Sequence, residues 1–158
     1  MEIPVKITHV PIASAGMLIR KPIAEVFEAF VDPAITSHFW FSHGSARLQA
    51  GRQIRWDWRM HDVSVQVAVK AVEQDRRILI EWGNPDATTT VEWLFAARPD
   101  HTTFVDITNR GFQGNGDEVV KQALDSTEGF ALVLAGAKAF LEHGIVLNLV
   151  ADRFPDGL

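Results

Sequence analysis

Apolar and polar residues alternate through Ile54–Trp82, which reads IRWDWRMHDVSVQVAVKAVEQDRRILIEW. Three runs within this stretch place tryptophan, valine or isoleucine at every second position, and short polar links separate the runs. A period of two puts alternate side chains on opposite faces of a strand, so one face is buried and the other meets water. Links this short join neighbouring strands as hairpins. The stretch therefore predicts three strands of an antiparallel meander.

The same pattern extends the predicted sheet in both directions. Val91–Phe95 and Val105–Ile107 give two later strands, and Met17–Arg20 gives an earlier one. The residues before it, with prolines at 4 and 11, read as an extended arm. A sheet of so many strands twists and curls, so its apolar face needs a cover.

Two short helices follow the first predicted strand. Apolar residues recur at helical spacing through Ile23–Phe30, and Pro22 suits the first helical position. Asp32-Pro33 ends this helix, because the residue before a proline resists helical dihedrals, and it caps a second helix that reaches about Ser37.

A long helix is predicted from a cap at Asp117 to His143, with Gly144 as its stop. At ~1.5 Å per residue it is about 40 Å long, enough to cover the sheet. The apolar run 145–150 is expected to pack back on the body. The predicted fold class is α+β: a helix-grip, with a curved antiparallel sheet around the C-terminal helix. Such a sheet fills poorly at its centre, which predicts an internal cavity entered near the short helices and loops.

Composition limits the possible functions. The 158 residues fit one domain, 1–158, and the absence of cysteine excludes thiol catalysis and disulfides. A net charge of −5 without any basic run argues against nucleic acid or an anionic membrane surface as partner. No apolar stretch is long enough to span a bilayer, and the first residues lack a signal pattern, so a cytoplasmic location is expected.

Short motifs near the first helices resemble a known superfamily. They are Ile19-Arg20-Lys21-Pro22, Val26-Phe27, Phe30-Val31-Asp32-Pro33 and His38-Phe39-Trp40. They look like the entry helices of the START/Bet v-type superfamily, also called SRPBCC. This resemblance implies a helix-grip fold with a hydrophobic cavity for lipids, polyketides or other small apolar molecules.

Later motifs resemble one bacterial branch, named after the activator of the heat-shock-chaperone ATPase. They are Asn109-Arg110-Gly111-Phe112, Glu128-Gly129-Phe130 and Leu141-Glu142-His143-Gly144. The resemblance covers nearly the whole chain after residue 14. This branch makes a chaperone a possible partner.

Strand parity, helical spacing and a place in the loop near the expected cavity mouth identify candidate residues for the cavity wall. They are His38, Trp40, Trp56, Trp58, Trp82, Trp93, Asn109, Phe112, Phe130 and Leu134. His38 in the loop after the short helices can act as an acid or base, or fix that loop by a hydrogen bond. Asn109 shares the parity of Val105 and Ile107, so its amide can bind a ligand oxygen or cap the turn toward Gly111.

No catalytic, cofactor or metal motif stands out. The six histidines form no HExxH or HxH pair, and no Gly-x-Ser-x-Gly, Gly-x-Gly-x-x-Gly or phosphate loop occurs. The first hypothesis is therefore a protein that binds a small apolar or aromatic ligand without a cofactor. The alternatives are a cofactor-independent cyclase, aromatase or hydratase using His38, and a module that interacts with a chaperone or with itself. Homodimerisation stays open.

Overall fold

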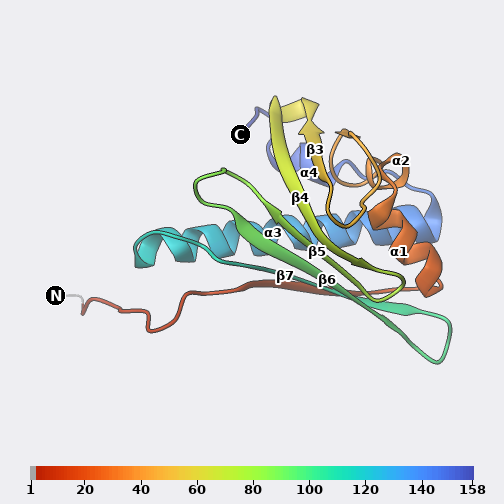
Figure 1. Cartoon of the computed structure of the whole chain (residues 1–158), viewed down its shortest axis with the longest axis horizontal. Helices are drawn as coiled ribbons and strands as arrows, with labels where there is room; N and C mark the ends of the chain where they lie inside the picture. Colours follow the sequence, from red (N-terminus) through yellow and green to blue (C-terminus); the bar gives the residue numbers. More distant parts are fainter. Residues whose placement is uncertain (1–2) are drawn as a thin grey trace.

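A computed structural model describes residues 3–158 of the chain. Its strands are β1 (Ala13–Ile19), β2 (His43–Gly44), β3 (Gln53–Trp58), β4 (Val63–Glu73), β5 (Arg77–Trp82), β6 (Thr89–Ala97) and β7 (Thr103–Arg110). They form one antiparallel sheet in the order β1-β7-β6-β5-β4-β3-β2. The sheet curves around the long helix α3 (Gly116–His143), as Figure 1 shows. The predicted α+β helix-grip fold is confirmed.

The prediction of strands was accurate where apolar and polar side chains alternate. It failed at the start of β1, where the side chains are small. β1 starts at Ala13, four residues before the predicted Met17. Ala13 pairs with Asn109 and Ile19 with Thr103, so β7 imposes the extended form along the whole segment. The first four residues of β1, Ala13–Gly16, include none that favours a strand by itself. Pairing with a neighbour overrides weak local propensity here.

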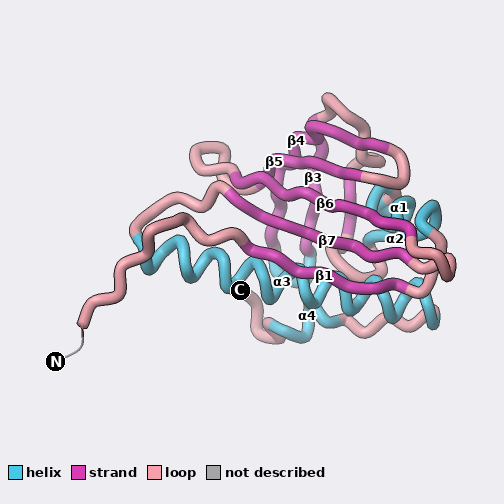
Figure 2. Tube along the Cα trace, turned by 90° about the horizontal axis from the view of Figure 1, so that it is seen from below, coloured by secondary structure: helices cyan, strands magenta, loops and turns pink. Residues whose placement is uncertain are grey.

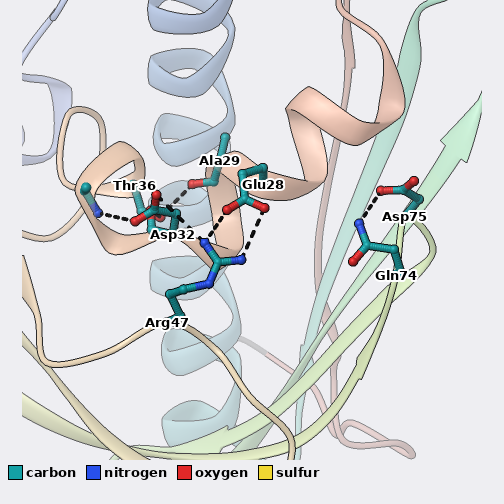
Figure 3. Close-up of polar contacts among 8 residues, drawn as sticks. Glu28, Ala29, Asp32, Thr36, Arg47, Gln74 and Asp75 are labelled. Atoms are coloured by element: carbon teal, nitrogen blue, oxygen red, sulfur yellow. Dashed lines mark hydrogen bonds and ion pairs between the residues drawn. The ribbon is translucent and has the colours of Figure 1, made fainter.

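The two short helices are α1 (Ile23–Val31) and α2 (Pro33–Thr36), and their junction is fixed by polar contacts drawn in Figure 3. The Ala34 N–H donates to the Asp32 carboxylate over 3.0 Å, so Asp32 caps α2 as predicted. The Thr36 hydroxyl donates to the carbonyl of Ala29, and Arg47 pairs with Glu28 of α1. Pro22 is the N-cap of α1 and not its first helical residue, so the helix begins one residue later than predicted, at Ile23.

Helix α3 begins two residues earlier than the sequence suggested. Its cap is Asn115, whose side chain accepts a hydrogen bond from the Glu118 N–H, and not Asp117. An amide oxygen satisfies the free N–H groups of a first turn as well as a carboxylate does, so both residues were plausible caps. Gly144 ends α3 in the left-handed conformation at φ 66°, as predicted.

The segment after α3 is half-exposed and leads to a short helix, α4 (Leu149–Arg153). Ile145, Val146 and Leu147 are 45–50% exposed, so the apolar run packs back on the body only in part. Seen from below, α3 runs along the sheet beside β1, with α4 close to α3 (Figure 2). Within residues 3–158, no helix is long and apolar enough to cross a membrane.

The concave side of the sheet is filled largely by aromatic rings. We call this group the aromatic cluster; its members are Trp40, Phe41, Trp56, Trp58, Trp82, Trp93 and Phe130. The loop after α2 inserts Trp40 and Phe41 over the inward tryptophans of the sheet, with ring centroids of Trp40 and Trp56 4.8 Å apart. The core therefore sits between the sheet, α1 and the C-terminal half of α3.

Candidate functional site

A pocket of about 300 Å³ lies between α3 and the sheet, beside the aromatic cluster. This volume is at the lower end of the range for small-molecule sites. Five apolar and four polar or small residues line it: Trp40, Trp82, Phe130, Val133 and Val150, with Asn109, Asp125, Ser126 and Gly129.

The hollow exists because α3 presents small residues here. Gly129 has no atom within 4 Å of the place where a Cβ would be, and Ser126 precedes it by one turn. Further along the same helix, Phe130, Leu134 and Ala137 are buried against the sheet. The space beside Gly129 is therefore left open.

Three aromatic rings form the apolar wall of the pocket. The ring centroid of Phe130 lies 5.7 Å from that of Trp40 and 5.9 Å from that of Trp82, and Trp40 and Trp82 meet edge to face at 5.8 Å. Rings in contact at these distances support one another's orientation. The wall is therefore held in place without a ligand.

Helix α4 closes one side of the pocket through Val150. The His61 imidazole Nε2 lies 3.3 Å from the Val150 carbonyl oxygen, and the Arg153 guanidinium pairs with Glu128 of α3 over 2.5 Å. The sequence predicted an entrance near the short helices and the loops. The loop after α2 contributes Trp40 to the lining, but α1 and α2 contribute no residue to this pocket. The reason is that Trp40 and Phe41 fill the end of the sheet nearest α2.

Asn109 is the most buried polar group of the pocket, at 3% exposure. Its amide nitrogen donates to the Thr89 hydroxyl and to the Thr90 carbonyl, each over 2.9 Å. Its amide oxygen accepts a hydrogen bond from the Ser126 hydroxyl, also over 2.9 Å. The side chain thus ties β7 to β6 and α3, which differs from the predicted cap toward Gly111; contact of Asn109 with a ligand stays a prediction.

His38 lies outside the pocket. Its ring is stacked on that of Phe140, with centroids 4.3 Å apart, and its Nδ1 lies 3.2 Å from the Ile35 carbonyl oxygen. This geometry matches the loop-fixing role that the sequence offered as an alternative to acid–base chemistry. The side chain is exposed.

The other predicted wall residues divide into two groups. Trp40, Trp82, Asn109 and Phe130 come together around the pocket. Trp56, Trp58 and Trp93 belong to the aromatic cluster but do not line the pocket, and Leu134 is fully buried in the core. Phe112 packs in a separate cluster with Ala13, Val119 and Ala123. Their binding of a ligand stays a prediction.

Sequence reasoning missed Asp125, Ser126, Gly129, Val133 and Val150 as lining residues. Ser126, Gly129, Phe130 and Val133 recur at the spacing of one helix face, so extending the face of Phe130 toward the N-terminus would have found the first two. Val150 carries no such signal, because α4 reaches the pocket through tertiary packing alone.

The charged groups around the pocket are few. Asp125 stands at its edge, and its carboxylate lies 2.7 Å from the Lys121 ammonium in an exposed ion pair. The carboxylates with a lowered pKa lie elsewhere: a hydrogen bond from Ser64 lowers the pKa of Asp57, for example, and Asp57 faces away on β3. Among residues 3–158, no group of three or more His, Cys, Asp or Glu side chains could hold a metal ion.

Comparisons with known proteins agree with this architecture. The family described as Activator of Hsp90 ATPase homolog 1-like protein matches residues 20–142. Protein SSP2350 from Staphylococcus saprophyticus is 30% identical with a TM-score of 0.75, over 87% of this chain and 96% of that one. No curated protein matches significantly.

Two solved structures of lower identity share the fold. DynU16, a protein in the dynemicin biosynthetic locus, is 21% identical with a TM-score of 0.70, over 85% of this chain and 48% of that one. The Aha1 dimer from Colwellia psychrerythraea is 14% identical with a TM-score of 0.72, over 85% of this chain and 98% of that one. Helix α4 lies beyond the residues that the family matches.

Proposed function

The chain belongs to the family of Activator of Hsp90 ATPase homolog 1-like proteins, and from this membership we propose that the pocket beside α3 binds a small apolar or aromatic molecule. The observation that carries the proposal is the wall of three rings, Trp40, Trp82 and Phe130, around open space. Each ~100 Å² of apolar ligand surface buried there contributes about 2.5 kcal/mol. Few polar atoms oppose such burial.

Binding ranks ahead of catalysis. The cyclase, aromatase or hydratase alternative used His38 as acid or base, and this imidazole stacks on Phe140 outside the pocket. The location of DynU16 in a biosynthetic locus is consistent with small-molecule chemistry in that protein. It supplies no reacting group for this chain.

Substitution of Gly129 tests the proposal. Gly129→Leu attaches a branched side chain at a Cβ position that has no atom within 4 Å, and it replaces a poor helix former by a good one. We expect native mass spectrometry or tryptophan-quenching titration to find saturable binding of an aromatic or aliphatic ligand by the native protein. The quenching arises from Trp40 and Trp82, and Gly129→Leu should weaken the binding at least tenfold.

The matched control is Gly129→Ala, which makes the same helix gain but fills less of the pocket. Its effect on affinity should be smaller than that of leucine. Equal affinity of the native and leucine proteins would overturn the assignment to this pocket. Absence of saturable binding across lipids and polycyclic aromatics would overturn ligand binding itself.

Self-association is the second proposal, and exposed apolar side chains favour it. Residues 3–12 lead away from the sheet beside the first turns of α3 (Figures 1 and 2), and Ile3 and Val5 are 87% and 92% exposed. Leu124 on α3 is 65% exposed nearby. The Aha1 dimer shares the fold. Sedimentation of the native protein against a Val5→Glu, Leu124→Glu variant tests it: a dimer that the variant loses is the expected result.

A further inference from the structure

The hydrogen-bonding capacity that Asn109 and Ser126 leave free in the pocket is that of acceptors. An asparagine amide has two N–H donors, and in Asn109 both are used by Thr89 and Thr90. The single proton of the Ser126 hydroxyl goes to the Asn109 oxygen. What remains free is one lone pair on that oxygen and the lone pairs of Ser126. This pair of residues can accept a hydrogen bond from a ligand but has none left to donate.

The lining also lacks a cation. No lysine, arginine or histidine is among its residues, and Asp125 at the edge carries a negative charge. The other side-chain donors of the lining are the indole N–H groups of Trp40 and Trp82, which are neutral. A carboxylate moved from water into such surroundings loses its hydration without gaining a charged partner, which is costly.

We propose that the pocket selects an uncharged aromatic ligand that carries a hydroxyl or amino group, and that the oxygen atoms of Asn109 and Ser126 accept the hydrogen bond from that group. The proposal rests on the proposed function and adds a ligand class to it. Asn109 and Ser126 are the specificity-determining residues. The rings of Trp40, Trp82 and Phe130 supply affinity without discriminating among aromatic ligands.

Three probes of one shape test this selection: naphthalene, 2-naphthol and 2-naphthoate. All three present the same rings, and they differ only in having no polar group, a neutral donor or an anion. Affinities are measured by tryptophan quenching at pH 7. 2-Naphthol should bind about 3- to 10-fold more tightly than naphthalene, because one net hydrogen bond contributes a difference of that size. The affinity for 2-naphthoate should be at least tenfold below that for 2-naphthol.

Two variants assign the selection to its residues. Asn109→Leu should reduce the ratio between 2-naphthol and naphthalene to about one while naphthalene still binds. Leu94→Ala, at an exposed position on β6 outside the lining, should leave that ratio and the affinity for 2-naphthoate unaltered. If Asn109→Leu fails to fold, the ratio measured with the native protein decides the question by itself.

The outcomes separate this proposal from the proposed function. If naphthalene and 2-naphthol bind equally and Gly129→Leu blocks both, the pocket is a ligand site but does not prefer a hydrogen-bond donor, and this proposal is wrong. Tighter binding of 2-naphthoate than of 2-naphthol would overturn it as well. Failure of all three probes to bind overturns the selection, and the lipid panel then decides whether ligand binding itself fails.

Discussion

The two halves of α3 contact the same sheet in different ways. In the C-terminal half, Phe130, Leu134 and Ala137 are buried, and rings from the loop after α2 close the remaining space. In the N-terminal half, Val119 and Ala123 are buried, but the small residues Ser126 and Gly129 leave the pocket open beside the sheet. We call these the filled half and the open half. The comparison shows that side-chain size at a few helix positions, and not the backbone architecture, decides where a helix-grip is solid and where it is hollow.

Each half also has a polar tie between α3 and the sheet. In the filled half, the Lys138 ammonium donates to the Leu18 carbonyl over 2.8 Å and to Glu142 over 2.7 Å, and Glu142 accepts from the Arg20 N–H. In the open half, Ser126 donates to Asn109. The filled half thus combines polar ties with aromatic packing, whereas the open half combines one buried amide with the small apolar cluster of Ala13, Phe112, Val119 and Ala123.

The largest expected effect tests the filled half. Trp56 is 2% exposed, and its ring is stacked on that of Phe41 with centroids 4.9 Å apart. Trp56→Ala should lower the free energy of unfolding by about 3–5 kcal/mol, because it leaves a cavity that rigid neighbours cannot fill. Urea denaturation measures this loss. Leu94→Ala, at an exposed position on β6, is the control and should change stability by less than about 0.5 kcal/mol. If both variants lost equally little free energy of unfolding, the aromatic cluster would not be tightly packed.

Much of the filled half was predictable from sequence, and the open half only in part. The parity of Ile54 and Trp56 fixes which side chains point inward, since a period of two is a local property. The position of the pocket depends on Trp40 and on Val150, which reach it from a loop and from α4. Their placement follows from tertiary packing, for which the chain carries no periodic signal. The same reason explains why β1 was predicted too short.

Removing the buried amide tests the open half. Asn109→Ala leaves the Ser126 hydroxyl and the Thr90 carbonyl without their partner. We expect a loss of about 1–3 kcal/mol in the free energy of unfolding, the cost of unsatisfied polar groups near the core. Ser126→Ala is the milder control, since solvent in the pocket can replace the hydroxyl. If Asn109→Ala lowers the free energy of unfolding no more than Ser126→Ala does, the amide does not hold this half together.

A pH titration tests the polar tie of the filled half. Burial raises the pKa of Glu142, but the hydrogen bonds from the Arg20 N–H and from Lys138 outweigh it, so the net pKa is lower than the ordinary value of 4.5. A carboxylate with a lowered pKa stabilises the folded state above its unfolded-state pKa and loses this contribution as pH falls through the folded-state value. Glu142→Gln should therefore cost about 1–2 kcal/mol at pH 7 and progressively less below pH 4.5. Denaturation of both proteins at pH 7 and pH 3 measures the difference, and a constant gap would contradict this assignment.

The smallest effect distinguishes the halves most directly, because one substitution can be made in both. Gly129 and Gly136 lie two turns apart in α3. A Cβ at 129 meets no atom within 4 Å, whereas a Cβ at 136 comes within 3.2 Å of the Phe39 Cβ and 3.3 Å of its carbonyl oxygen. Alanine in place of a helical glycine stabilises by about 0.5–1 kcal/mol. Gly129→Ala should show that gain in full by thermal or urea denaturation. Gly136→Ala should lose it, because the buried backbone of Phe39 would have to move. Equal gains at both positions would mean that the filled half has as much room as the open half, and the comparison would fail.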